Sequence, residues 1–116
     1  MEKSDAIAAL AALAQDSRLD VFRLLVQAGP DGLPAGQIGE RLGLPSATLS
    51  FHLNQLRQAG LVTFRRDGRS LIYTAEYSAM NALLGYLTEN CCRGDPAACG
   101  VGTCDGSNLV KEGSRQ

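Results

Sequence analysis

The four cysteines of the chain all lie in its last quarter, where their number and spacing suit the binding of a soft ion. Cys91 and Cys92 are adjacent, Cys99 follows after six residues, and Cys104 follows after four more. The loop between the pair and Cys99 contains glycine and proline, and it can bring Cys99 back over the pair. Three thiolates around one centre suit an ion that needs only three ligands, such as As(III) or Sb(III). We therefore expect an ion-binding site in this segment.

Other chemistries of the same thiols stay open. A zinc or cadmium site would need all four cysteines, because the only histidine, His52, lies far away in the sequence. A disulfide among Cys92, Cys99 and Cys104 would instead make a redox switch. The thiols could also be inert residues of a tail. In a cytoplasmic chain, we expect reduced thiols rather than a disulfide scaffold.

A thiol enzyme such as an arsenate reductase is a further class to weigh. Such an enzyme needs a cysteine of low pKa in a loop that cradles an anion. The Cys92-Arg93 pair is suggestive, but no phosphate-type cradle follows it. We therefore expect a protein that is not an enzyme and that requires no cofactor.

Length and composition indicate an ordinary globular domain. The chain has 116 residues, of which 45% are hydrophobic and 20% are charged, as in a single folded domain. No run of 18 apolar residues is present, so no membrane span is expected. The N-terminus lacks a basic start that leads into an apolar run, so we expect no secretion signal and a cytoplasmic protein.

The charges are distributed unevenly along the chain. The net charge is −1, yet residues 41–73 carry five arginines against one acid, Asp67, which is a net charge of +4. A basic region on an otherwise acidic chain is typical of a surface that faces an anion such as DNA. The five arginines are Arg41, Arg57, Arg65, Arg66 and Arg69.

Hydrophobic periodicity and capping signals predict five helices and one β-hairpin. The helices are expected over residues 4–14, 17–28, 35–42, 46–59 and 76–90. Gly43 leaves only a tight turn between the third and fourth helices, which is the helix-turn-helix signature. Strand-like runs at 61–66 and 69–74 flank Asp67-Gly68, a dipeptide that favours a two-residue hairpin turn. A basic hairpin directly after a helix-turn-helix is typical of a wing.

The predicted fold class is therefore mainly α with a small β-hairpin, a winged helix-turn-helix. We expect residues 1–90 to form a DNA-binding and dimerisation domain, and residues 91–116 to form a cysteine-containing, inducer-binding segment with a flexible tail. The first and last helices carry apolar stripes that either line the core or pair across the two-fold axis of a homodimer, and we expect the pairing. These stripes are Ile7, Leu10, Ala11 and Ala14 in the first helix, and Met80, Leu83, Leu84 and Leu87 in the last.

The candidate DNA contacts lie on the fourth helix and on the hairpin. The second helix of a helix-turn-helix reads base edges in the major groove, and the hairpin arginines suit phosphate or minor-groove contact. His52 is also a candidate packed residue, and Phe51 could stack on DNA or fold back against the wing. A module of this fold that binds only protein is the alternative, against which the polar face and the arginines argue. The candidate contacts are Ser46, Ala47, Thr48, Ser50, Phe51, His52, Asn54, Arg57, Arg65, Arg66 and Arg69.

Four sequence motifs together resemble the ArsR/SmtB family of metalloregulators. They are LAQDSRL at residues 13–19, GLPSATLSFHL at 43–53, LRQAGLV at 56–62 and RDGR at 66–69. The resemblance implies a dimeric winged-helix repressor that leaves its operator, double-stranded DNA, when a metal or metalloid binds. The segment at 33–38 has no cysteine and residues 76–90 have no histidine, so the family's arsenic site on the first motif helix and its zinc site on the last helix do not carry over.

The vicinal cysteine pair resembles an arsenic-responsive branch of the same family, in which a third ligand follows the pair. This resemblance implies that Cys91, Cys92 and Cys99 bind trivalent arsenic, with Cys104 as a candidate fourth thiol. It also implies a repressor of an arsenic-resistance operon that is released by arsenite, antimonite or methylarsenite. A zinc- or cadmium-type or thiol-redox-responsive repressor of the same fold is the alternative.

Overall fold

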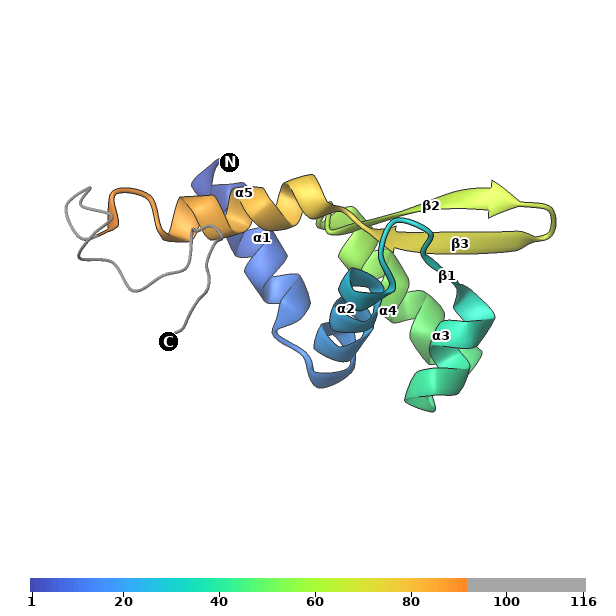
Figure 1. Cartoon of the computed structure of the whole chain (residues 1–116). Helices are drawn as coiled ribbons and strands as arrows, with labels where there is room; N and C mark the ends of the chain where they lie inside the picture. The colour runs from blue at the N-terminus through green and yellow to red at the C-terminus, as the bar shows by residue number, and fades with distance from the viewer. Residues whose placement is uncertain (92–116) are drawn as a thin grey trace, which may run out of the picture. The chain divides into compact units, whose positions relative to one another are not determined.

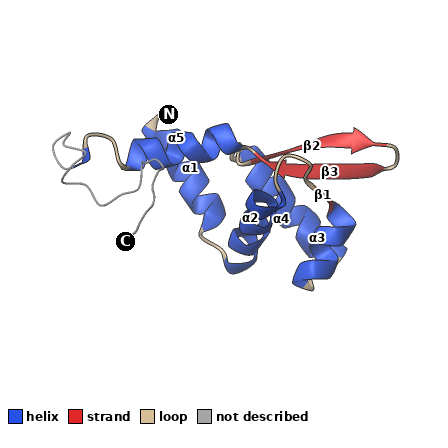
Figure 2. Cartoon of the chain, in the orientation of Figure 1, coloured by secondary structure: helices blue, strands red, loops and turns tan. Residues whose placement is uncertain are grey.

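The computed structural model of the chain describes residues 1–91. Within this range the backbone forms five helices and three short strands (Figure 1, Figure 2). Contacts divide the chain into one unit of residues 1–83 and a second that begins at Leu84, inside the last helix. The elements are α1 (Lys3–Leu13), α2 (Asp16–Ala28), β1 (Leu33–Pro34), α3 (Ala35–Leu42), α4 (Ser46–Gln58), β2 (Val62–Asp67), β3 (Ser70–Ala75) and α5 (Tyr77–Leu87).

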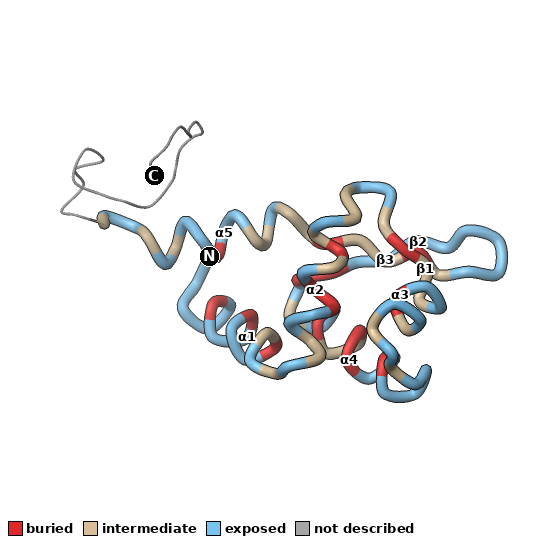
Figure 3. Tube along the Cα trace, turned by 60° about the horizontal axis from the view of Figure 1, so that its bottom comes forward, coloured by how far each residue is buried: buried red, intermediate tan, exposed pale blue. Residues whose placement is uncertain are grey.

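The core of the first unit lies where α2 and α4 pack on each other and α2 packs on β3. In α4 the leucines Leu49, Leu53 and Leu56, spaced three or four residues apart, are all buried on one side of the helix. In α2 the buried face is Val21, Phe22 and Leu25, whereas Leu19 is 44% exposed. Buried and exposed positions alternate along the same helices in Figure 3. The core also takes in Leu33, Ile38, Leu61, Val62, Ile72 and Ala75.

The face of α1 that packs inward is made of alanines, while Ile7 and Leu10 of the stripe expected to pair across the dimer axis lie on the outside. Ala6, Ala9 and Ala12 are buried, while Ile7 and Leu10 are 59% and 43% exposed. Small alanine side chains let α1 approach α2 and α4 closely, so the bulky residues remain on the outer face. A capping box between Glu2 and Asp5 starts the helix.

The three strands form an antiparallel sheet in the order β1-β3-β2. The hairpin is confirmed, but its two loop residues are Gly68 and Arg69, one position later than predicted, because Asp67 pairs with Ser70. Gly68 has a positive φ of 63° and Arg69 does not, which is the requirement of a type II′ turn. The two-residue β1 was not predicted, since Leu33 and Pro34 alone carry no strand periodicity. In Figure 1 the β2–β3 hairpin projects beyond α3 and α4 as a wing.

The start of α5 belongs to the first unit, where a side-chain hydrogen bond links it to α2. Tyr77 Oη donates to the carbonyl oxygen of Val26 at 3.0 Å, and Leu83 is buried. In the second unit, Leu84 and Leu87 are 54% and 55% exposed, and the helix ends at Leu87, three residues before its predicted end. Across residues 1–91, no helix combines the length and apolar character that a bilayer crossing requires.

Candidate nucleic-acid interface

Helices α3 and α4 form a helix-turn-helix with a short connection. Gly43 caps α3 in the left-handed conformation, and the Leu44 amide donates to the carbonyl of Gly39 at 3.0 Å. A Cβ atom at Gly39 would lie 3.2 Å from the Leu44 oxygen and 3.4 Å from Leu49 Cδ2, so glycine permits the close approach of the turn. This close packing fixes the angle between α3 and α4.

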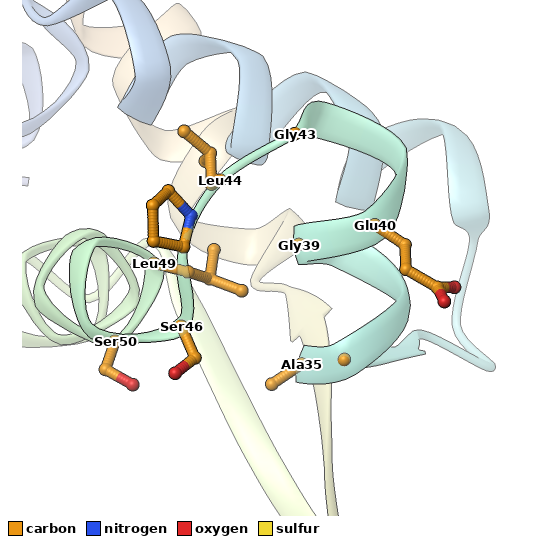
Figure 4. Close-up of a pocket in the computed structure, with 10 residues that line it drawn as sticks. Ala35, Gly39, Glu40, Gly43, Leu44, Ser46, Leu49 and Ser50 are labelled. Carbon is orange, nitrogen blue, oxygen red and sulfur yellow. The ribbon is translucent and has the colours of Figure 1, made fainter.

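The two sides of α4 differ sharply in polarity and burial. Leu49, Leu53 and Leu56 face the core, whereas the first turns on the other side are exposed. In Figure 4 the Ser46 and Ser50 hydroxyl groups lie near each other at the edge of a cavity of about 500 Å³ between α3 and α4. The exposed candidates on this helix are Ser46, Ala47, Thr48, Ser50, Phe51 and Arg57, and Asn54 is half-buried.

The N-terminus of α4 presents its backbone donors without a side-chain cap. Pro45 is the N-cap residue and has no side-chain oxygen to accept from the first turn. Amide groups at such a helix start, together with the Ser46 and Thr48 hydroxyls, are donors of the kind that bind phosphate oxygens. The start of α4 therefore has the chemistry needed to position a helix on DNA.

The wing arginines Arg65, Arg66 and Arg69 are all exposed, but one of them makes a hydrogen bond within the protein. The guanidinium of Arg65 donates through Nη2 to the backbone carbonyl of Asp31 at 3.1 Å, which ties β2 to the loop before β1. Arg66 and Arg69 have no hydrogen bond or ion pair with any other residue in the described range 1–91. Arg66 and Arg69 are therefore the wing cations that can engage a phosphate without first breaking a contact.

A chain of contacts links the recognition helix to the wing. Arg57 Nη2 donates to Asn54 Oδ1 at 2.7 Å, and the guanidinium carbon of Arg57 lies 5.7 Å from the centre of the Phe64 ring. Phe64 in turn lies 5.5 Å from Tyr73 on the neighbouring strand. Sequence reasoning selected Asn54 and Arg57 but missed Phe64, because only the packing of β2 beside α4 brings the ring to Arg57.

His52 differs from the other candidate contacts because its side chain is buried. Its side chain is only 7% exposed, and Nδ1 lies 3.4 Å from Arg18 Nη1. Burial lowers the pKa of His52 from its ordinary value of 6.5, and the Arg18 charge lowers it further. His52 is therefore a packed residue rather than a base contact, which is the second interpretation that the sequence allowed. Phe51 is 56% exposed and packs edge-on against His52, with ring centres 5.7 Å apart.

Of the four cysteines, only Cys91 lies within the described residues. Its side chain is half-buried, and its amide donates to the carbonyl of Thr88 at 2.9 Å. The preceding residue, Asn90, has a positive φ of 58°, a conformation that ends a helical path and redirects the chain. Cys92, Cys99 and Cys104 lie outside the described residues, and within residues 1–91 no three His, Cys, Asp or Glu side chains are grouped as metal ligands would be.

A family model described as a helix-turn-helix domain matches residues 13–64, which include α2, α3 and α4. The chain is 32% identical over 95 residues to the transcriptional activator HlyU of Vibrio cholerae, a match that covers 80% of this chain and 85% of HlyU. It is also 32% identical over 80 residues to the nodulation protein NolR of Rhizobium meliloti, over 69% of this chain. The chain spans 63% of NolR and 58% of the regulator YceK of Bacillus subtilis.

Solved structures repeat the arrangement of helices and wing. An ArsR-like transcriptional regulator from Rhodococcus superposes with a TM-score of 0.65 at 26% identity, over 72% of this chain and 76% of that one. A homodimeric winged helix-turn-helix DNA-binding domain from Mycobacterium bovis, described as a possible ArsR-family regulator, superposes with a TM-score of 0.60 at 28% identity, over 75% and 81%. The observed fold is therefore one on which DNA-binding regulators are built.

Proposed function

We propose a function from one premise: the chain belongs to the ArsR-type family of winged helix-turn-helix transcriptional regulators, as its 32% identity with HlyU across 85% of that protein shows. We propose that it binds double-stranded operator DNA as a homodimer and represses transcription. The observation that carries the DNA-binding part is the exposed polar start of α4 beside a wing with unengaged arginines. The residues proposed to contact DNA are Ser46, Ala47, Thr48, Ser50, Phe51, Asn54, Arg57, Arg65, Arg66 and Arg69. A protein with this function would act in the cytoplasm.

The proposed dimer uses the first and last helices. Ile7 and Leu10 of α1 are large apolar side chains on the outside of the first unit, and α5 exposes Leu84 and Leu87. Covering them with a partner subunit removes apolar area from water, at about 25 cal/mol for each Å². The M. bovis neighbour is homodimeric by its description. A two-fold dimer would present two copies of α4 to a palindromic site.

The proposed inducer is trivalent arsenic, bound by Cys91, Cys92 and Cys99 with Cys104 as a candidate fourth thiol. Support comes from the number and softness of the thiols and from the positive φ of Asn90, next to Cys91. Binding of the ion by the thiolates would change the conformation at the end of α5. Because α5 is proposed to lie in the dimer interface, this change would alter the affinity of the dimer for DNA. Coupling typical of allostery would weaken operator binding by roughly 5- to 150-fold.

A gel-shift titration of the reduced protein on its own promoter DNA tests this proposal. Arsenite should release the DNA from the wild type and from Cys104→Ser, but not from Cys92→Ser, which is otherwise matched in size and chemistry. Release by zinc or cadmium and not by arsenite would favour a divalent-metal regulator. Release by an oxidant, reversed by a thiol reductant, would favour a redox switch, and either outcome would overturn arsenic as the inducer.

The sign of regulation needs its own measurement, because the relative HlyU is named an activator. A reporter gene placed under the bound promoter should be silent when the protein is present and should become active when arsenite is added. A reporter that loses expression on deletion of the protein would overturn repression while leaving DNA binding intact.

A further inference from the structure

Arg57 is an exposed cation that lies against an aromatic ring, that of Phe64. Among residues 1–91, Arg57 contacts no carboxylate; it donates to the Asn54 amide oxygen and lies over the Phe64 ring. A carboxylate partner would cancel the charge of the guanidinium, whereas an aromatic face holds the cation and leaves its charge in place. Arg57 is thus held in one position and keeps the full positive charge that attracts phosphate.

Phe64 is a partly exposed aromatic residue on the wing. It lies on β2, an edge strand of the sheet, and its side chain is 41% exposed. Its ring lies 5.5 Å from the ring of Tyr73, the residue that pairs with Phe64 on β3. The same ring meets the guanidinium that extends from α4, so it joins the wing to the recognition helix.

The hydrogen bond to Arg57 fixes how Asn54 presents its amide. An asparagine side chain has one acceptor oxygen and one NH₂ group with two donors, and rotation by 180° exchanges them. Because Arg57 is a donor only, the Oδ1 atom must face it, and the NH₂ group then faces the other way. An amide held in one orientation can tell an adenine edge from other bases, since that contact needs the donor and acceptor in fixed places.

We infer that Phe64 is a positioning residue for sequence recognition: its ring holds Arg57, and Arg57 orients the Asn54 amide for reading a base edge. The inference rests on the proposed operator binding and adds to it a residue that does not itself contact a base. According to this inference, the wing contributes to base recognition by α4 and does not only contact phosphates. Loss of the ring should therefore change which bases are preferred, and not only how tightly DNA is held.

The test is selection of binding sites from a randomised DNA pool by the full-length protein, compared for wild type, Phe64→Leu and Phe64→Tyr. Phe64→Leu should lower the preference at one base pair of each half-site by roughly two- to fivefold, the size expected of an exposed cation–π contact. Phe64→Tyr keeps the aromatic face and should keep the preference. Thr63→Ala, an exposed neighbour on the same strand, is the control and should also keep it.

A double-mutant cycle separates positioning from general destabilisation. In an Arg57→Gln background, Phe64→Leu should cause no further loss of preference at that base pair, because the link is already broken. Arg57→Lys, which keeps the charge but not the planar fork, gives a second variant in case Phe64→Leu folds poorly, and it should lose preference at the same base pair.

Several results overturn the inference. They are an unchanged base profile for Phe64→Leu and Arg57→Lys, an equal loss of affinity for all sequences, or the same loss in the Arg57→Gln background. A wild-type protein that selects no sequence at all would instead overturn the proposed function. The two failures are therefore distinguishable within one experiment.

Discussion

The Nη1 atom of Arg18 lies 3.4 Å from the Nδ1 atom of His52, and this contact joins the start of α2 to the middle of the recognition helix. Arg18 also donates through Nε to the carbonyl of Ala12 at 2.7 Å, in the last turn of α1. One side chain therefore contacts both α1 and α4. Because a guanidinium only donates, Nδ1 of His52 accepts, and the neutral ring carries its proton on Nε2.

This arrangement predicts a loss of stability in acid that is due to His52. Burial and the Arg18 charge hold the pKa of His52 below 6.5, so the unfolded chain takes up this proton before the folded protein does. The contribution of neutral His52 is complete above pH 6.5 and is lost as the pH falls through the lowered pKa of the folded state. Urea unfolding at pH 7.5, 6.5 and 5.5 measures the change.

The matched variant for this prediction is His52→Gln, which keeps a polar side chain but does not titrate. Its free energy of unfolding should depend less steeply on pH below 6.5 than that of the wild type. Equal pH dependence in the two proteins would show that groups other than His52 control acid stability.

The elements that the sequence predicts well are those whose signal is local. The bounds of α3 and the start of α4 follow from Pro34, Gly43 and Pro45, which constrain the backbone wherever they stand. The hairpin follows from its glycine, yet its register shifted by one residue, because a type II′ turn needs positive φ only at Gly68.

The features that the sequence did not predict depend on packing between distant elements. The sequence did not indicate that α1 packs inward through Ala6, Ala9 and Ala12, because apolar periodicity singles out Ile7 and Leu10, which lie exposed on the outer face. For the same reason no sequence signal pairs Arg57 with Phe64. The candidate contacts on α4 were predictable, since they occupy the side opposite Leu49, Leu53 and Leu56.

Two glycines provide a matched test of close packing in the sheet. Gly32 and Gly68 both have positive φ, 71° and 63°, so alanine at either position costs about 1–2 kcal/mol of backbone strain. A Cβ at Gly68 meets nothing, whereas at Gly32 it would clash with the Tyr73 carbonyl and the Thr74 methyl group. Overpacking should add about 1–3 kcal/mol to the cost of Gly32→Ala. Urea unfolding of the two variants checks this order, and equal losses would contradict it.

The outer face of α1 provides a test of the proposed dimer. Leu10 and Leu19 are 43% and 44% exposed, so replacing either with glutamate changes the monomer surface to the same extent. Only Leu10→Glu would bury a carboxylate in the interface, and it should raise the dimer dissociation constant by more than about a hundredfold. Sedimentation equilibrium measures both variants, with circular dichroism to verify folding. A Leu10→Glu protein as dimeric as Leu19→Glu would move the interface away from α1.

The salt dependence of DNA binding tests which arginines meet phosphates. Arg66 on the wing and Arg23 on α2 are both exposed, so Arg66→Gln and Arg23→Gln remove the same charge from different places. Each phosphate contact contributes about 0.9 to the slope of log affinity against log salt concentration. A dimer uses Arg66 twice, so Arg66→Gln should reduce the slope by about 1.8, and Arg23→Gln should leave it nearly unchanged. Binding isotherms between about 50 and 200 mM salt give the slopes directly. Equal slopes for the two variants would mean that net charge alone attracts the DNA and that the wing does not lie against its backbone.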